Sequence, residues 1–137
     1  MADVASAPKM LIDTSHLPVL VVRYLDDFDA DELEAHIAEL DAVVQAQKGP
    51  WAMVIEMAGG PPLSGRVRDL SVDFWRRNRG HMKKTLRSLT YVTSNKLMMG
   101  VVYAGTWLFR LPTKVGVAST VADAVASAQV QLNPRSK

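Results

Sequence analysis

The sequence predicts one α/β domain around a central, mixed but mainly parallel β-sheet, with about five strands and about four helices. Apolar, β-branched runs of strand length alternate with segments whose apolar residues recur at helical spacing. The length of 137 residues fits one domain, and 48% hydrophobic with 22% charged residues is typical of a globular core rather than of disorder. We therefore expect a single domain over residues 10–133, with short tails at 1–9 and 134–137.

Two strands and a helix open the predicted domain. Residues 10–12 and 17–24 are apolar runs on either side of a polar segment, which predicts a hairpin. Asp29, followed three residues later by Glu32, has the pattern of a capping box and predicts the start of a helix. Gly49 and the proline after it indicate that this helix has ended.

A buried strand, a second helix and another buried strand follow. Residues 51–57 form a nearly continuous apolar run, the pattern of a strand covered on both faces. Ser64 is expected to cap a helix whose pattern weakens at Asn78 and Gly80, two residues of low helix propensity. Residues 88–93 are rich in Thr, Tyr and Val and predict the next strand.

The remaining elements are a helix, a short strand and a final helix. Residues 96–109 are apolar nearly all the way round a helix, so we expect this helix to be buried on more than one side. Residues 114–118 predict the strand. The final helix is expected to start at Ser119 or the threonine after it and to stop before Pro134.

The sequence lacks the patterns of common catalytic and metal sites. It has no cysteine, which excludes disulfides and thiolate chemistry and favours a reducing cytoplasm. His16, His36 and His81 do not have the spacing of metal ligands. The acids of residues 26–31 lack the Gly and Glu of a calcium loop, and Gly59-Gly60 is not part of a phosphate-binding motif. We therefore predict a protein that is not an enzyme and requires no metal or cofactor.

Charge is divided along the chain. Residues 1–58 hold 11 acidic and 3 basic residues, whereas residues 59–137 hold 3 acidic and 13 basic ones, for a net charge of only +2. The densest basic run is expected on the second helix and its exit turn. Its members are Arg66, Arg68, Arg76, Arg77, Arg79, Lys83, Lys84 and Arg87. A plain solvated helix face is one interpretation. The functional interpretation is that this run binds an acidic protein or an anionic lipid, or that it pairs with the acidic half of a second copy. Nucleic-acid binding is a weaker hypothesis because few aromatic rings lie nearby.

A long apolar segment stands out at residues 97–109. These 13 uncharged residues fall short of the roughly 20 that a membrane-spanning helix needs. Burial in the protein's own core, an interface in a homodimer or with a partner, and the wall of a pocket for a lipid or other apolar ligand all remain open. The side chains proposed for the interface or pocket are Met98, Met99, Val102, Tyr103, Trp107 and Phe109.

The order of several segments resembles that of SpoIIAA-like or STAS-like domains, which are related to the anti-anti-sigma factors. The segments are the strand Val54-Ile55-Glu56-Met57, the helix start Leu63-Ser64-Gly65, the strand Ser88 to Ser94, the run Thr106-Trp107-Leu108 and the closing Ser119-Thr120-Val121-Ala122-Asp123-Ala124. The resemblance covers residues 10–132 and implies a STAS-like fold. It also implies a non-enzymatic regulatory or scaffolding module that binds protein partners; a small carrier or sensor of a lipid or other apolar ligand is the alternative.

One serine takes its interest from this resemblance. In the anti-anti-sigma relatives, a serine in an Asp-Ser-Ser-Gly turn is phosphorylated by a partner kinase. Ser64-Gly65 falls at the matching place, which makes Ser64 a candidate phosphoacceptor. Pro62 and Leu63 precede it where the relatives carry the aspartate, and a serine at a helix start is more commonly a plain N-cap.

Overall fold

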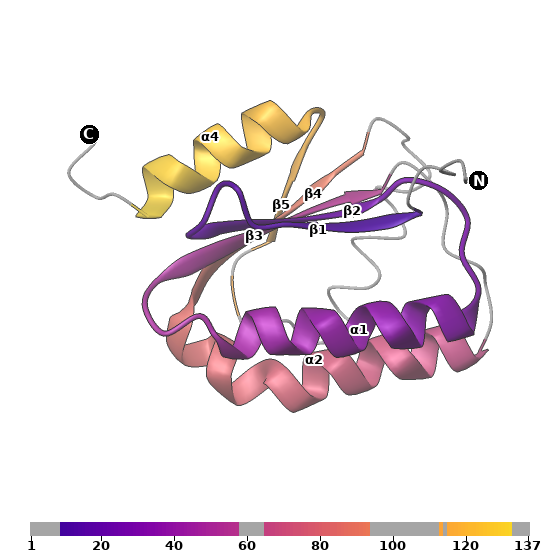
Figure 1. Cartoon of the computed structure of the whole chain (residues 1–137). Coiled ribbons are helices and arrows are strands. Elements are labelled where there is room, and N and C mark those ends of the chain that lie inside the picture. Colours follow the sequence, from indigo (N-terminus) through magenta and orange to yellow (C-terminus); the bar gives the residue numbers. More distant parts are fainter. Residues whose placement is uncertain (1–8, 58–64, 94–112, 114, 133–137) are drawn as a thin grey trace.

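The computed structural model describes residues 9–57, 65–93, 113 and 115–132, which form one five-stranded sheet with helices on both faces (Figure 1). The strands are β1 (Met10–Asp13), β2 (Val19–Tyr24), β3 (Trp51–Met57), β4 (Leu86–Val92) and β5 (Val115–Ala118). The helices within the described residues are α1 (Ala30–Gln45), α2 (Gly65–Thr85) and α4 (Val121–Leu132). The helix predicted over residues 96–109 lies outside the described residues.

The sheet is mixed but mainly parallel, as predicted. Its strand order is β1-β2-β3-β4-β5. β1 lies at one edge, antiparallel to β2, and every other neighbouring pair is parallel. Parallel neighbours need a crossover connection, and α1 supplies it between β2 and β3. Figure 1 shows α1 and α2 side by side beneath the sheet and α4 above it. The single α/β domain predicted from the sequence is confirmed in class and architecture.

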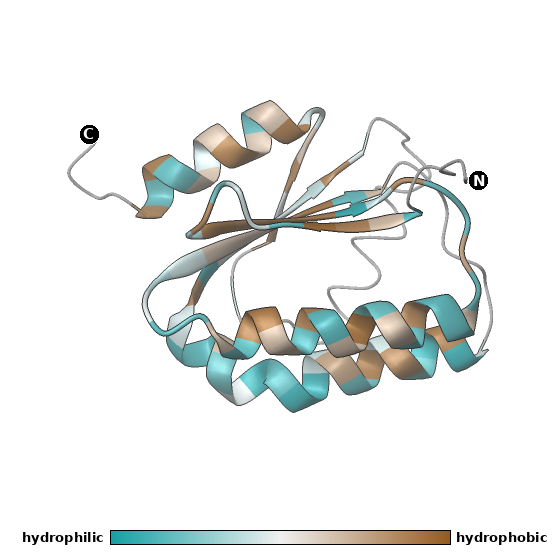
Figure 2. Cartoon of the chain, in the orientation of Figure 1, coloured by the Kyte–Doolittle hydropathy of each residue, from teal (hydrophilic) through white to brown (hydrophobic). Residues whose placement is uncertain are grey.

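The core has two layers because successive side chains of a strand point to opposite faces of the sheet. In β2, Leu20 and Val22 pack in the cluster that includes the apolar residues of α1 and α2. Val19 and Val21 pack in the other cluster, with α4. Figure 2 shows apolar colour along the strands and along one side of each helix, with polar residues on the outer sides.

Helix α1 begins as its sequence predicts. The side chain of Asp29 accepts a hydrogen bond from the Glu32 amide at 2.8 Å, and the Glu32 carboxylate accepts one from the Asp29 amide at 2.9 Å. This reciprocal pair is the capping box, which satisfies two of the amides that a helix N-terminus leaves without partners. The box fixes where α1 starts and therefore which of its acids face α2.

Helix α2 is longer than its sequence predicts. The expected weakening at Asn78 and Gly80 does not occur, and the helix continues to Thr85. Asn78 is buried and bonded: its Nδ2 donates to Asp41 Oδ1 at 2.8 Å and to the Phe74 carbonyl at 3.0 Å. Met82 is fully buried one turn later. Tertiary contacts therefore hold the helix over two residues of low propensity.

Candidate functional site

The predicted basic run lies on the outer surface of α2 and at the start of β4. One side of α2 is buried against α1 and the sheet by Val67, Phe74, Trp75, Asn78 and Met82. The side chains of this run are all exposed: Arg66, Arg68, Arg76, Arg77, Arg79, Lys83 and Lys84 on α2, and Arg87 on β4. Because α2 does not end near Gly80, the residues from Arg79 to Lys84 are fixed on a helix rather than in an exit turn.

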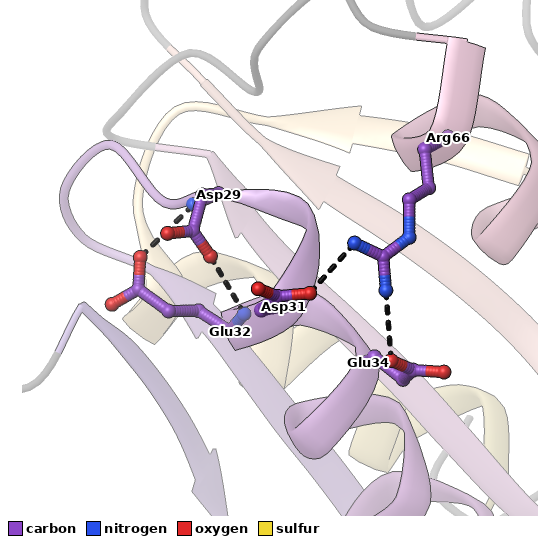
Figure 3. A network of polar contacts seen from close by, with 5 residues as sticks. All are labelled: Asp29, Asp31, Glu32, Glu34 and Arg66. Carbon is purple, nitrogen blue, oxygen red and sulfur yellow. Dashed lines mark hydrogen bonds and ion pairs between the residues drawn. The ribbon is translucent and has the colours of Figure 1, made fainter.

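The first turn of α2 is bound to the first turn of α1. Arg66 Nη1 donates to Asp31 Oδ1 at 2.6 Å, and its Nη2 donates to Glu34 Oε1 at 2.9 Å (Figure 3). Figure 3 shows the guanidinium of Arg66 reaching across to α1 just beyond the capping box of Asp29 and Glu32. The hydrogen bond with Asp31 raises the pKa of Arg66 further above its already high value. Two carboxylates of the acidic half therefore neutralise this arginine within the chain.

The middle of α2 is bound to α1 through Asp41. Arg77 Nη2 donates to Asp41 Oδ2 at 2.6 Å, while Asn78 Nδ2 donates to the other carboxylate oxygen. The amide nitrogen of the Gln45 side chain donates to Asn78 Oδ1. Gln45 is the last residue of α1. These contacts show that α1 and α2 run in the same direction and that α1 ends opposite Asn78.

Past Asn78, α2 continues without α1 beside it. The seven residues from Arg79 to Thr85 make about two further turns, which we call the projecting end of α2. From Ala42 to Pro50, the end of α1 and the loop after it contain no acidic residue, and Lys48 adds a positive charge. Lys83 and Lys84 lie in the last turn of the helix. The last turn of α2 is therefore basic, and no carboxylate of α1 is paired with Lys83 or Lys84.

Two arginines between these regions have only longer contacts. Arg76 Nη1 lies 3.7 Å from Asp73 Oδ1, and Arg68 Nε lies 3.8 Å from Asp69 Oδ1. Charge-assisted hydrogen bonds are about 2.7–2.9 Å long, so these pairs are loose. Their guanidinium groups are more exposed than that of Arg66 and are available to a partner.

The structure therefore divides a run that the sequence presents as one cluster. Arg66 and Arg77 bind carboxylates of α1, and Arg87 Nη1 donates to the Lys84 carbonyl at 3.1 Å. Some of the acidic residues of the first half are therefore paired with basic residues of the second half inside the molecule. The sequence carries part of the signal for this pairing: one strand separates the acidic helix from the basic helix, and in a parallel sheet two such helices run in the same direction.

An aromatic cluster with a buried imidazole lies on the inner side of α1. The rings of Tyr24 and Phe28 are 5.5 Å apart, and those of Tyr24 and His36 are 5.4 Å apart, edge to face. His36 is buried, and its Nε2 has no hydrogen-bond partner among the described residues. Burial lowers the pKa of His36, opposed by the charge of Glu39, and burial raises the pKa of Tyr24. His36 is therefore a neutral core residue at ordinary pH.

Other predicted residues lie outside the described part of the chain. These are Ser64, Met98, Met99, Val102, Tyr103, Trp107 and Phe109. The phosphoacceptor and apolar-ligand hypotheses stay predictions. Within the described residues, no group of three His, Asp or Glu side chains is placed to hold a metal ion. Among the helices of those residues, none is long and apolar enough to cross a membrane.

Comparison with known proteins supports the fold. No family model matches the sequence, and no curated protein matches it. The structure is similar to the solved structure of an uncharacterized protein of the DUF3478 family from Shewanella loihica PV-4, which is described as having a SpoIIAA-like fold. The two chains are 13% identical and superpose with a TM-score of 0.67, over 92% of this chain and 99% of the other. At this identity the likeness concerns the fold alone, and it confirms the predicted resemblance: the chain has a SpoIIAA-like fold.

Proposed function

We propose that the protein is a non-enzymatic regulatory or scaffolding module, acting in the cytoplasm, that binds an acidic protein partner through the exposed basic side chains of α2. The observation that carries this proposal is the surplus of positive charge on that helix. Arg66 and Arg77 are occupied by carboxylates of α1, but Arg68, Arg76, Lys83 and Lys84 are exposed and bound to no carboxylate of α1. A one-signed surface of this kind attracts an oppositely charged partner and orients it.

The fold supports a binding role. SpoIIAA-like domains resemble the anti-anti-sigma factors, which act by binding other proteins. The exposed basic residues of α2 lie on a helix surface, and the buried His36 packs against the ring of Tyr24. A helix surface offers area for a protein contact without a pocket for a small substrate.

The proposal is tested by isolating the protein from its native host and re-forming each retained complex from purified components. The test variant carries Arg68→Glu, Arg76→Glu, Lys83→Glu and Lys84→Glu, all at exposed positions. It should lose affinity by about a hundredfold or more, because like charges then meet at the interface. The control carries Glu39→Lys on α1 and Asp123→Lys on α4, which are also exposed, and should bind normally. Binding of the test variant with wild-type affinity, or the absence of any retained protein, would contradict the proposal.

A further inference from the structure

Gly80 is a glycine that the described structure does not require. It lies inside α2, where glycine disfavours helix more than any residue except proline. No glycine among the described residues has a positive φ, so the backbone at Gly80 would accept any side chain. Apart from its chain neighbours and the backbone of its own helix, a Cβ added there would meet no heavy atom within 4 Å, so close packing against other parts of the described chain does not explain the glycine either. What the glycine provides is a low point on the exposed surface of the helix.

The neighbours of this low point are basic. On a helix surface a residue lies beside those three and four positions away, and for Gly80 these include Arg76, Lys83 and Lys84. All three are exposed, and within the described residues the one ion pair that any of them makes inside 4.0 Å is the 3.7 Å contact of Arg76 with Asp73. We call Gly80, Arg76, Lys83 and Lys84 together the Gly80 surface. Glycine commonly serves where another backbone or ligand approaches closely, and here the approach would be flanked by positive charge.

We propose that the Gly80 surface is the contact point for an acidic segment of a partner protein, with the partner's main chain lying against Gly80 and its carboxylates binding Arg76, Lys83 and Lys84. This inference rests on the proposed function and locates it. The rest of α2 shows the same chemistry within the chain: Arg66 and Arg77 bind the carboxylates of a neighbouring acidic helix at 2.6–2.9 Å. The partner would extend that arrangement to three basic residues of α2 that bind no carboxylate of α1.

The surroundings favour a protein over a nucleic acid or a membrane. Bases of single strands are held by stacking on exposed rings. The rings of α2 nearest the Gly80 surface are those of His81, which is partly buried, and Trp75, which is buried edge to face against Phe74. Membrane-surface helices insert apolar side chains beside their basic ones. The large exposed apolar residues of the described chain lie away from α2: Leu11 on β1, Leu17 in the turn after β1, and Val130 on α4.

The test uses the full-length protein and a labelled, helical Glu- and Ala-rich peptide of about 15 residues, the length that an isolated helix needs. Binding is followed by fluorescence anisotropy, and amide shifts are mapped by NMR. The peptide should shift the amides of residues 76–87 most, and binding should weaken as salt is raised. The same peptide with Gln in place of Glu should not bind. Largest shifts on another face of the molecule, or no binding, would overturn the inference.

Two glycine variants sharpen the test. Gly80→Gln adds a side chain to the proposed contact and should weaken peptide binding at least tenfold while raising the melting temperature, because Gln is the better helix former. Gly65→Gln is the matched control: Gly65 is also exposed, on the same helix, with open space around it, and its variant should bind as the wild type does. Equal binding by both variants would contradict a close approach at Gly80.

Other outcomes separate this inference from the proposed function. If a native partner is lost on reversal of the basic charges but kept by Gly80→Gln, the proposed function stands and the location at Gly80 is wrong. If wild-type protein retains no partner, the proposed function itself fails. Anionic vesicles or a DNA strand that bind more tightly than the acidic peptide, with the same loss on Gly80→Gln, would show that the surface exists but that its occupant is not a protein.

Discussion

The two parts of α2 carry similar basic residues but use them differently. In the part from Gly65 to Asn78, Arg66 and Arg77 bind carboxylates of α1, and Asn78 is buried in the same contact. In the projecting end, Lys83 and Lys84 are exposed beside no acidic residue of α1 or its following loop. The comparison teaches that helix length contributes to the difference: α2 has 21 residues and α1 has 16, so Lys83 and Lys84 lie past the end of α1.

The largest expected effect concerns how the projecting end is held in place. Met82 is fully buried in the cluster beneath the sheet, so Met82→Ala removes most of its side chain from a packed site. We expect a loss of about 2–5 kcal/mol in the free energy of unfolding. Urea denaturation followed by circular dichroism measures it. A loss below about 1 kcal/mol would show that the projecting end is not anchored to the core. The two parts of α2 would then differ in how well they are held in place rather than in how their charges are paired.

The next effect concerns the junction between the two parts. Asn78→Ala removes the partner of Asp41 Oδ1 and of the Gln45 side chain from a buried position. Leaving these polar groups without partners should cost about 1–3 kcal/mol of unfolding free energy. Arg76→Ala, on the exposed side of the same helix, is the control and should change stability by no more than about 0.5 kcal/mol. Equal losses for the two variants would mean that the junction adds nothing to the helix pairing.

Much of this architecture is predictable from local patterns, and the junction shows where prediction stops. The capping box at Asp29 and the buried run of residues 51–57 act locally, and both are confirmed. Asn78 is stabilised in its helix by Asp41 and Gln45, which lie more than thirty residues earlier in the sequence, so its low propensity alone predicts the wrong outcome. The division of the basic run has the same origin. It depends on how α1 and α2 are aligned, and no single segment records that alignment.

A pH titration compares a buried ionisable group with the exposed charges of α2. Burial lowers the pKa of His36 in the folded state, so below its usual value of about 6.5 the unfolded chain binds a proton that the folded chain does not. Stability should therefore be constant above that pH and fall as pH decreases from about 6.5 to 5, by at most about 1.4 kcal/mol per pH unit.

The matched variant for this titration is His36→Phe, which keeps a ring beside Tyr24 and removes the proton site. Its unfolding free energy should lose most of the slope between about pH 6.5 and 5, a range above that in which Asp and Glu side chains ordinarily titrate. An unchanged slope in His36→Phe would assign the pH dependence to another group. His36 lies on α1 and is not part of the Gly80 surface, so the effect of pH on peptide binding should be the same in His36→Phe as in the wild type.

The smallest effect tests the first turn of α2. Arg66→Ala removes two ion pairs, with Asp31 and Glu34, that lie in solvent, where water and salt weaken them. The melting temperature should fall slightly at low salt and should match that of the wild type at about 1 M NaCl, where the screening length is roughly 3 Å. Arg68 lies two residues further along the helix and is bound to no residue of α1, so Arg68→Ala should show no such salt-dependent difference. If the two variants behave alike, the carboxylates of α1 do not distinguish Arg66 from the other arginines. The unequal pairing along α2 would then begin at Arg77 and Asn78, where the contact with Asp41 is partly buried.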